Sequence, residues 1–468
     1  MIIHRGARAL LRLVAIALAI ALACTAWHDV SKAWDVWAYH LPFAAKITGI
    51  VDGATYAFSA ENQHRFEGFP LLAEALQGMF WRVTGRPESA NFVALFSLFA
   101  LVIVLRRTFD VPMHLSLIAL LAIPLVQIHA TAAYVDLPAN ALATMLLLVT
   151  YRTLVQRSPP SVRSLVVAAA LAAATANMKF QLVPLVVAAA SVLVFRSLSA
   201  DRNRRARLLV IALALPLVFA TPLKNVVLHG NPVWPIEIRI PGIPFAEGAY
   251  AASPRWLEHA PRPFRFACSV LEIGTRPITR RWSIDQFTPP DDPGYRMGGF
   301  FGAYVVLNLG ALVLAAARMR ARESRAAAGL FAGVTVFISF VPQSHELRYY
   351  LVWMLLLVSL NLVLWSRARP LTTGMLAACA LAVVVWSTSA LYIYPNGDPF
   401  ARFLAAHVDE ARVRSFAPGA RICIAREPWT FLWAPQFHGR RDYVVQEEAD
   451  ASDCKGAELL DTPLPETK

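Results

Sequence analysis

The chain has 468 residues, of which 57% are hydrophobic and only 16% are charged, and its mean hydropathy is +0.49. This composition excludes an ordinary soluble domain, because the apolar residues gather in runs of near-bilayer length. The net charge of +13 does not indicate nucleic-acid binding, since the arginines stand in short clusters between apolar runs and form no basic face with interleaved aromatics. We therefore expect a polytopic membrane protein with no nucleic-acid partner.

Apolar runs long enough to cross a bilayer predict about eleven transmembrane helices. They cover residues 8–27, 90–105, 112–130, 137–153, 162–178, 180–196, 207–223, 298–317, 327–342, 347–366 and 371–393. Arginine-rich connections alternate with connections that are poorer in cations or too long for the positive-inside rule to apply. The arginine-rich ones are 106–107, 152–163, 196–207, 318–325 and 367–369. The positive-inside rule then predicts a cytoplasmic N-terminus and a C-terminus on the opposite face.

This topology places three long segments outside the membrane, at residues 28–89, 224–297 and from 394 onwards. The first segment reads as short amphipathic helices with many aromatics, and the second as an ordered loop with short helices. The tail contains two strand-like stretches, 421–425 and 443–445, which predict a small α/β appendage. We accordingly divide the chain into a transmembrane region, 1–393, and a small C-terminal segment, 394–468.

One aspartate in the first outer segment needs an explanation. Asp35 stands in Trp34-Asp35-Val36-Trp37-Ala38, where aromatic neighbours at a membrane surface make a carboxylate costly to desolvate. A base that serves chemistry at the membrane surface explains that cost. A helix cap or a solvated interfacial charge is the alternative, and Asp29 is a competing carboxylate nearer the first helix.

A second carboxylate is expected on the same face. Asp136, in Tyr134-Val135-Asp136-Leu137-Pro138, lies where the third predicted helix meets the fourth. Two converging carboxylates suit a general base and a partner that orients substrate or binds a metal ion. A helix N-cap is the alternative for Asp136, because Pro138 and an apolar run follow it. The two roles are compatible.

Cations also stand at the outer ends of helices, against the topological bias. Lys179 lies between two apolar runs, Lys224 ends the seventh helix, and Arg348 lies in His345-Glu346-Leu347-Arg348-Tyr349. Such cations suit a phosphate or pyrophosphate at headgroup depth. Snorkelling to the interface is the alternative for each lysine. The predicted substrate-binding residues are Tyr39, His40, Lys179, Lys224, His345, Glu346, Arg348 and Tyr349.

Cysteine and histidine spacing indicates no metal site. His40, His64 and His345 are isolated from one another, and no pair has helix-face spacing with an acid. We assign no metal ligand and no certain cofactor, and a divalent cation stays open. Cys423 and Cys454 both fall in the C-terminal tail, and the sequence leaves open whether they pair.

Several of these motifs together resemble integral-membrane glycosyltransferases of the GT-C class. The bacterial branch that includes the lipid A aminoarabinose transferase and the protein O-mannosyltransferases is the most similar. The likeness covers roughly residues 10–395. It rests on Asp35 with Tyr39-His40-Leu41-Pro42, Phe69-Pro70-Leu71-Leu72, Ala133-Tyr134-Val135-Asp136-Leu137-Pro138, Lys179, Gly230-Asn231-Pro232 and Arg348-Tyr349.

The resemblance implies a GT-C fold in a bacterial inner membrane with a periplasmic active site. It also implies a polyprenyl-phosphate sugar donor, a catalytic aspartate matched by Asp35, and a second-loop acid matched by Asp136. Many members carry an acid directly after the aspartate, whereas this chain has Val36. Metal binding by adjacent acids is therefore not implied. Partners are the donor, membrane lipids, and a glycolipid, polysaccharide or protein acceptor.

Two other function classes stay open at this point. A lipid or sugar transporter would have charged or broken helices at mid-membrane and often repeated halves, whereas the ionisable residues here crowd the helix ends. An oligosaccharide polymerase or ligase would use arginines of a large outer loop. The loop 224–297 offers Arg239, Arg255, Arg262, Arg265 and Arg276 for that role.

Overall fold

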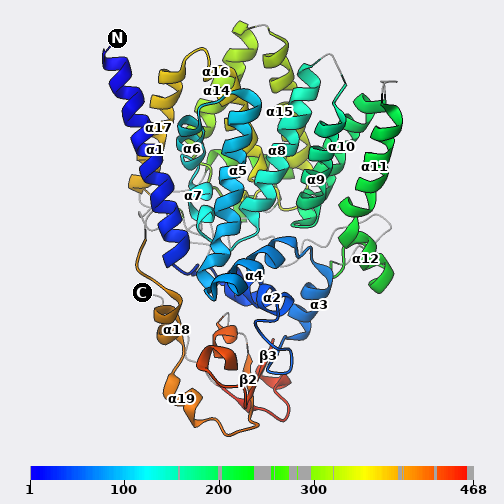
Figure 1. Ribbon diagram of the computed structural model, residues 1–468, viewed down its shortest axis with the longest axis vertical. Coiled ribbons are helices and arrows are strands. Elements are labelled where there is room, and N and C mark those ends of the chain that lie inside the picture. The colour runs from blue at the N-terminus through cyan, green and yellow to red at the C-terminus, as the bar shows by residue number, and fades with distance from the viewer. Residues whose placement is uncertain are drawn as a thin grey trace.

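The structure is a computed structural model in which a bundle of long helices carries two smaller layers at one end (Figure 1). The N-terminus lies at the opposite end of the bundle from those layers (Figure 1). The described residues are 2–156, 159–198, 203–236, 255–257, 259–273, 282, 297–319, 321–387, 393, 395–425 and 429–460.

Each of the eleven predicted apolar runs contains a helix or a bent pair of helices. These are α1 (Ile2–His28), α5 (Phe92–Phe109), α6 (Met113–Leu121) with α7 (Pro124–Ala130), α8 (Asp136–Val155), α9 (Val162–Ala176), α10 (Val183–Leu198), α11 (Arg204–Val218) with α12 (Ala220–His229), α14 (Gly302–Met319), α15 (Arg322–Phe340), α16 (Val352–Trp365) and α17 (Pro370–Ser387). Within the described residues, six helices are long and apolar enough to span a membrane, or eight if each bent pair counts as one. The chain is a multi-pass membrane protein, and crossing by α9, α15 and α16 stays a prediction.

Two predicted spans are bent where the sequence suggests straight helices. The α6–α7 pair turns by 102°, and α7 begins at Pro124. Proline lacks an N–H and its ring clashes with the preceding turn, so a helix cannot continue smoothly through it. The α11–α12 pair bends by 50° around Phe219, between Pro216 and Pro222. Because of the first bend, α7 does not continue along the axis of α6.

The first outer segment forms the short helices that its pattern predicts. They are η1 (Val36–His40), α2 (Leu41–Ile47), α3 (Ala60–Gly68), α4 (Leu72–Thr84) and η2 (Pro87–Asn91). Helices α2, α3 and α4 form a layer across the end of the bundle (Figure 1). Gly78 allows α4 to cross α2 closely, because a Cβ there would overlap the carbonyl oxygen of Ala44. This layer fixes the segment that contains Asp35.

The C-terminal segment folds into short helices and a small parallel sheet. Its elements are α18 (Phe400–His407), α19 (Glu410–Ser415), β2 (Arg421–Ala425), η6 (Thr430–Trp433), η7 (Pro435–His438), β3 (Val444–Glu448), η8 (Ala451–Asp453) and β4 (Glu458–Leu459). The two predicted strands are therefore present. The sheet order is β1-β3-β2-β4, and β1 (Tyr56–Ala57) comes from the first outer segment, which the sequence does not foretell. Tyr56 pairs in register with Val445.

A second apolar core joins the first outer segment to this tail. Trp37 is fully buried at its centre, with its ring 5.1 Å from that of Phe403 and 5.8 Å from that of Phe400. Asp29 accepts a hydrogen bond from the backbone N–H of Asp398 at 3.1 Å. This competing carboxylate therefore fastens the tail. The tail is packed onto the outer segment over a shared core.

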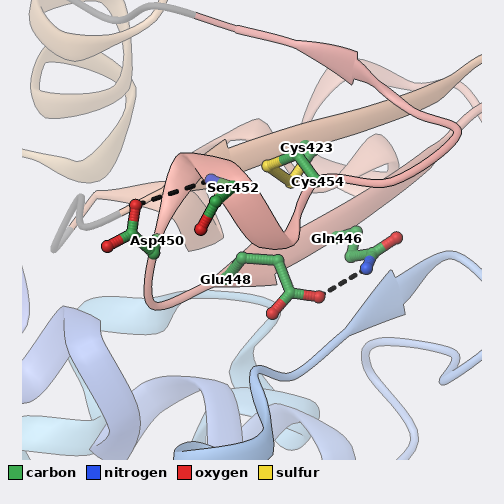
Figure 2. The surroundings of a disulfide bond; sticks show 6 residues. All are labelled: Cys423, Gln446, Glu448, Asp450, Ser452 and Cys454. Atoms are coloured by element: carbon green, nitrogen blue, oxygen red, sulfur yellow. Dashed lines mark hydrogen bonds between the residues drawn. A yellow bond between two sulfur atoms is a disulfide. The ribbon is translucent and has the colours of Figure 1, made fainter.

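The two tail cysteines form a disulfide. Cys423 on β2 and Cys454 after η8 are bonded, with Cα atoms 5.6 Å apart (Figure 2). The bond closes the crossover that contains β3, since the two cysteines are 31 residues apart in the chain. Closing such a loop restricts the unfolded chain and so stabilises the folded tail.

The second outer segment is described in part. Helix α12 continues to His229, followed by the short helices η4 (Arg255–Leu257) and α13 (Arg262–Leu271), and the rest of the predicted loop lies outside the described residues. Arg262 donates to the carbonyl of Phe340 at 3.3 Å, and Arg265 is buried. Arg239 and Arg276 lie outside the described residues, as does the side chain of Arg255.

The contact between β3 and the first outer segment predicts a pH-dependent stability. Burial raises the pKa of Glu447 to about 7, although Ser59, Asn62 and Tyr56 donate hydrogen bonds to its carboxylate. The ionised form is thus disfavoured in the folded protein. This group stabilises the fold fully below pH 4.5, and the contribution falls by about 3 kcal/mol as the pH rises to about 7.

Thermal unfolding of the purified protein between pH 4 and pH 9 measures this effect. We expect Glu447→Gln to flatten the decline in melting temperature between pH 4.5 and pH 7, because glutamine does not titrate. Glu410→Gln, an exposed change in the same tail, is the control and should keep the wild-type slope. An unchanged slope in Glu447→Gln would show that this carboxyl does not set the dependence.

Candidate active site

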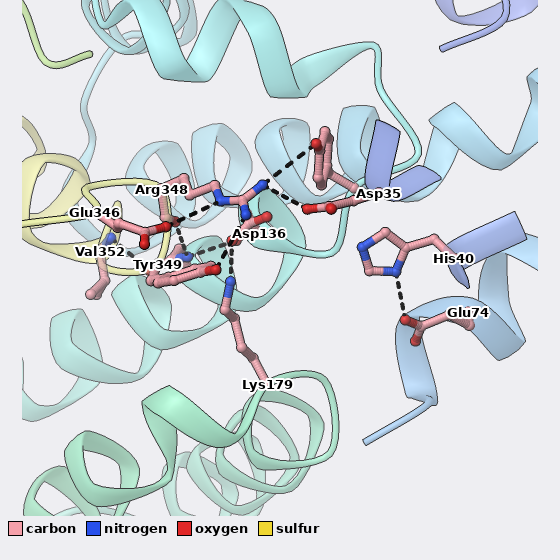
Figure 3. A network of polar contacts seen from close by, with 11 residues as sticks. Asp35, His40, Glu74, Asp136, Lys179, Glu346, Arg348, Tyr349 and Val352 are labelled. Atoms are coloured by element: carbon pink, nitrogen blue, oxygen red, sulfur yellow. Dashed lines mark hydrogen bonds and ion pairs between the residues drawn. The ribbon is translucent and has the colours of Figure 1, made fainter. Parts of the chain in front are cut away.

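Four charged side chains meet where the first outer segment covers the bundle. Asp35 precedes η1, Asp136 is the first residue of α8, Lys179 follows α9, and Arg348 lies in the turn before α16. They come from four separate stretches of sequence, and all four residues are buried. The predicted convergence of the two carboxylates with two of the three cations is present (Figure 3).

Asp35 is held by Arg348 and not by a helix end. Its backbone is in the N-cap position of η1, but its side chain makes no capping hydrogen bond. Instead, Arg348 Nη1 donates to Asp35 Oδ2 at 2.8 Å (Figure 3). The structure therefore shows neither a helix cap nor a solvated charge at Asp35, and its catalytic role stays a prediction. The side chain keeps 12% of its surface exposed, which leaves one side open to an incoming group.

The electrostatics of Asp35 favour its ionised form. Burial opposes ionisation, but the attraction of Arg348 and His40 and the hydrogen bond from Arg348 outweigh it, so the pKa lies below the ordinary value of 3.8. Asp35 is thus a carboxylate at any physiological pH. Such a group accepts a proton only when its surroundings change or when the donor hydroxyl is acidified by bond formation.

Asp136 and Lys179 form a second buried pair. Lys179 Nζ donates to Asp136 Oδ1, and the same ammonium lies 4.2 Å from the ring centroid of Tyr349 (Figure 3). Val135 occupies the N-cap of α8, so Asp136 is the first helical residue. The helix dipole stabilises a carboxylate in the first turn, and Lys179 balances its negative charge.

Arg348 connects the two pairs through tyrosines. Its Nη1 also reaches Tyr134 Oη at 3.4 Å, and its Nη2 donates to Tyr349 Oη at 3.2 Å. Its guanidinium carbon lies 5.0 Å from the Tyr349 ring. Glu346 Oε2 lies 4.0 Å from Arg348 Nε. Burial raises the pKa of Tyr349 to about 12, so its phenol stays protonated and can donate a hydrogen bond.

The remaining predicted residues divide into two groups. Tyr39 and His40 lie at the network, since their ring centroids are 4.3 Å apart and His40 faces Tyr134 at 5.8 Å. His345 is buried in the Arg348 turn, and its carbonyl accepts from Ser269. Lys224 on α12 binds the carbonyl of Glu67 at the end of α3. Among the described contacts none joins Lys224 to the network.

Three residues that the sequence did not single out complete the site. Glu74 on α4 binds His40 Nδ1 at 2.8 Å, and both side chains are buried (Figure 3). Asn140 donates to the Arg348 carbonyl at 3.3 Å and accepts from the Val352 N–H at 2.9 Å. His129 on α7 packs 4.9 Å from the Tyr134 ring. Asn140 stands one helical turn after Asp136, and that spacing is the signal that could have found it.

No group of three histidine, cysteine, aspartate or glutamate side chains in the described part of the chain is arranged to hold a metal ion. The cations that are present, Arg348 and Lys179, have the chemistry to bind phosphate oxygens. The arrangement therefore suits an anionic ligand whose charge competes with Asp35 and Asp136 for these two cations.

The Asp136–Lys179 pair predicts a strong effect of removing one partner. We expect Lys179→Met to lower stability by about 3–5 kcal/mol, because Asp136 would remain buried without its cation. The double variant Asp136→Asn/Lys179→Met should recover most of the loss. Melting temperatures of the purified variants measure both effects.

The exposed ion pair between Arg367 and Asp110 supplies the control, since its atoms lie 2.7 Å apart at the surface. Arg367→Met should shift the melting temperature little, because exposed pairs contribute at most about 1 kcal/mol. If the double variant is as unstable as Lys179→Met, the burial of an unpaired charge is not the cause.

No protein-family model and no curated protein matches the chain. Crystal structures of ArnT from Cupriavidus metallidurans do match it. The apo form gives a TM-score of 0.54 at 12% identity, over 96% of this chain and 86% of that one. The form bound to undecaprenyl phosphate gives 0.51 at 13% identity, over 95% and 86%.

An oligosaccharyltransferase from Archaeoglobus fulgidus matches over 93% of this chain and 62% of that one at 12% identity, with a TM-score of 0.41 that is too low to argue from. The identity to ArnT is low, so the likeness concerns the fold. This chain has the polytopic GT-C class fold that the ArnT structures share.

Proposed function

We propose that this protein is a membrane glycosyltransferase that moves a sugar from a polyprenyl-phosphate donor to an acceptor hydroxyl. The observation that carries the proposal is the buried pair of Asp35 with Arg348, beside Lys179 and Asp136, at the end of the bundle where the outer segments lie. The fold supports it, because one of the ArnT structures that share it is bound to undecaprenyl phosphate.

The proposed reaction is a single displacement with inversion at the anomeric carbon. Asp35 takes the proton of the acceptor hydroxyl, and the oxygen attacks the anomeric carbon. The bond from that carbon to the donor's phosphate oxygen breaks, and polyprenyl phosphate leaves with the electron pair. The leaving group gains negative charge, which Arg348 and Lys179 stabilise in a site that excludes most water.

Charge balance suggests how the donor activates the base. In the resting site Arg348 is paired with Asp35, and Lys179 with Asp136. A phosphate that binds Arg348 competes with Asp35 for its N–H groups and adds a nearby negative charge. Both changes raise the pKa of Asp35, so the carboxylate becomes a better base when the donor is bound.

An apolar groove offers space for the prenyl tail. A cavity of about 490 Å³ lies between α8, α9, α10 and α11, lined by small and aliphatic side chains such as Ala168, Val186 and Leu215. Helices α9 and α10 flank the turn that contains Lys179. The two helices that flank Lys179 thus also line a hydrocarbon cavity, which suits the tail of a lipid-linked anion.

We also propose a bacterial inner-membrane location with a cytoplasmic N-terminus and a periplasmic C-terminus. The arginine-rich connections support it through the positive-inside rule. The acceptor is a glycolipid, a polysaccharide or a protein. Mass spectrometry of glycolipids from a deletion strain and its parent tests the first of these. Addition of a chelator to the purified enzyme tests whether a divalent cation is needed.

Replacing the base should abolish transfer, and the fold should survive because the amide oxygen of asparagine still accepts the hydrogen bond from Arg348. We expect Asp35→Asn to lower turnover by about 10²–10⁴-fold, because the amide accepts no proton. Transfer from a synthetic polyprenyl-phosphate sugar to membrane extracts measures it, with size-exclusion profiles as the folding check. Asp52→Asn, an exposed aspartate of the same outer segment, is the matched control. Full activity in Asp35→Asn together with loss in Arg262→Ala would favour the polymerase or ligase instead.

If the donor phosphate replaces Asp35 at Arg348, the pH profiles of kcat/KM and of kcat should decline at different pH values on the acid side. The kcat/KM profile reports the free enzyme, in which the pKa of Asp35 lies below 3.8, and should therefore be flat above about pH 5. The kcat profile reports the donor complex and should fall at a higher pH as the solution is acidified. The donor is a phosphodiester and does not titrate in this range. If both profiles decline at the same pH, the donor phosphate does not replace Asp35 at Arg348.

A further inference from the structure

A cavity outside the ion network lies between the first outer segment and the C-terminal sheet. It has a volume of about 270 Å³, close to the size of one sugar ring. Its walls come from η1, β1, α3, η6 and β3, so the cavity exists only because the tail is packed on the outer segment. Its lining residues are Trp34, Trp37, Ala38, Tyr56, Ser59, Glu61, Asn62, Arg65, Thr430, Phe431, Glu447, Glu448 and Ala449.

The lining combines aromatic faces with polar groups. Trp34 is 47% exposed at the cavity, although tryptophan is costly to leave in water. Glu61, Glu448 and Thr430 supply acceptors and a hydroxyl on the other walls. A ring with apolar C–H faces and peripheral hydroxyls satisfies both kinds of wall.

Charge argues against a phosphate in this cavity. Its lining contains two carboxylates, Glu61 and Glu448, a third acid, Glu447, whose ionised form is disfavoured by burial, and one cation, Arg65, which is itself paired with Glu61. An anion would be repelled, whereas neutral hydroxyls can donate hydrogen bonds to the carboxylates. The donor phosphate therefore belongs with Arg348 and Lys179, and the cavity suits a different part of the reaction.

The cavity and the ion network lie on two faces of the same short helix. Trp34, Trp37 and Ala38 line the cavity, at the i, i+3, i+4 spacing of one helix face. Asp35 and Tyr39, four residues apart, turn towards the network. Arg65 of the cavity lies 5.6 Å from the Tyr39 ring, which connects the two places.

The walls of the cavity are joined to one another by hydrogen bonds. Glu447 accepts from Ser59 at 3.2 Å and from Tyr56 at 3.3 Å. Asn62 donates to Glu447 and to the Ala38 carbonyl, the latter at 3.0 Å. These bonds tie β3 to η1 and α3, so the cavity is preformed.

We propose that this cavity is an acceptor subsite that binds a neutral sugar ring of a glycan, next to the base on the opposite face of η1. The proposal rests on the proposed glycosyl transfer and names its acceptor as a carbohydrate. Trp34 stacks on the ring, and Glu448 and Thr430 bind its hydroxyls. A neighbouring unit of the same glycan then presents its hydroxyl to Asp35.

Saturation-transfer NMR on the purified full-length protein tests this, with methyl glycosides of glucose, galactose, mannose and N-acetylglucosamine as probes. We expect at least one glycoside to bind, and Trp34→Ala and Glu448→Gln each to weaken its binding by about tenfold. Both residues are partly exposed, so the fold should survive. Trp27→Ala, at a similarly exposed tryptophan outside the cavity, should bind like the wild type.

The variants of the ion network separate this proposal from the function it rests on. Asp35→Asn should keep glycoside binding, whatever its effect on transfer. If the wild-type protein binds a glycoside but transfers no sugar, the subsite is supported and the proposed function is wrong. If the wild-type protein transfers sugar but binds none of the probes, the subsite is wrong. Binding that is lost in Lys179→Met and kept in Trp34→Ala would locate the sugar at the ion network and also overturn it.

Discussion

The contact between Arg348 and Asp35 is the interaction on which the outer half of this molecule depends. Desolvating a carboxylate is expensive, and only a cation with well-placed N–H groups compensates for it. Arg348 is itself held by Asn140, which binds its carbonyl and the N–H of Val352. The charge at the rim of the bundle is thus fixed by a helix in the bundle. Through it, the first outer segment is joined to the membrane core.

Both cations of the site are already paired with carboxylates at rest, and this has a chemical consequence. Asp35 and Asp136 are matched by Arg348 and Lys179, so an anionic ligand finds no spare positive charge and must exchange with an internal carboxylate. Exchange costs less than burial of a new charge, because the cations are already desolvated. In the proposed reaction, the same exchange would release Asp35 from its cation at the moment when a base is needed. Affinity for the donor and basicity towards the acceptor are then coupled through one guanidinium.

Much of this could be predicted from the sequence, since apolar runs and arginine clusters report directly on membrane insertion. The sequence also singles out Asp35, Asp136, Lys179 and Arg348 as candidates, because charge at a helix end in an apolar chain is conspicuous. The contact between Asp35 and Arg348 could not be predicted, since the two residues are 313 positions apart and no local pattern encodes it. Glu74 looks like one polar residue in an amphipathic helix. Lys224 has the same sequence signature as Lys179 but binds the carbonyl of Glu67 instead.

The C-terminal tail also constrains the position of η1. Trp37 packs against Phe403, and β1 joins the C-terminal sheet, so η1 is gripped by the tail on one face while Arg348 holds Asp35 on the other. A shift of the tail would therefore move the carboxylate relative to the bundle. Positioning a base within a few tenths of an ångström requires support from every side. The C-terminal segment is thus part of the scaffold that positions Asp35.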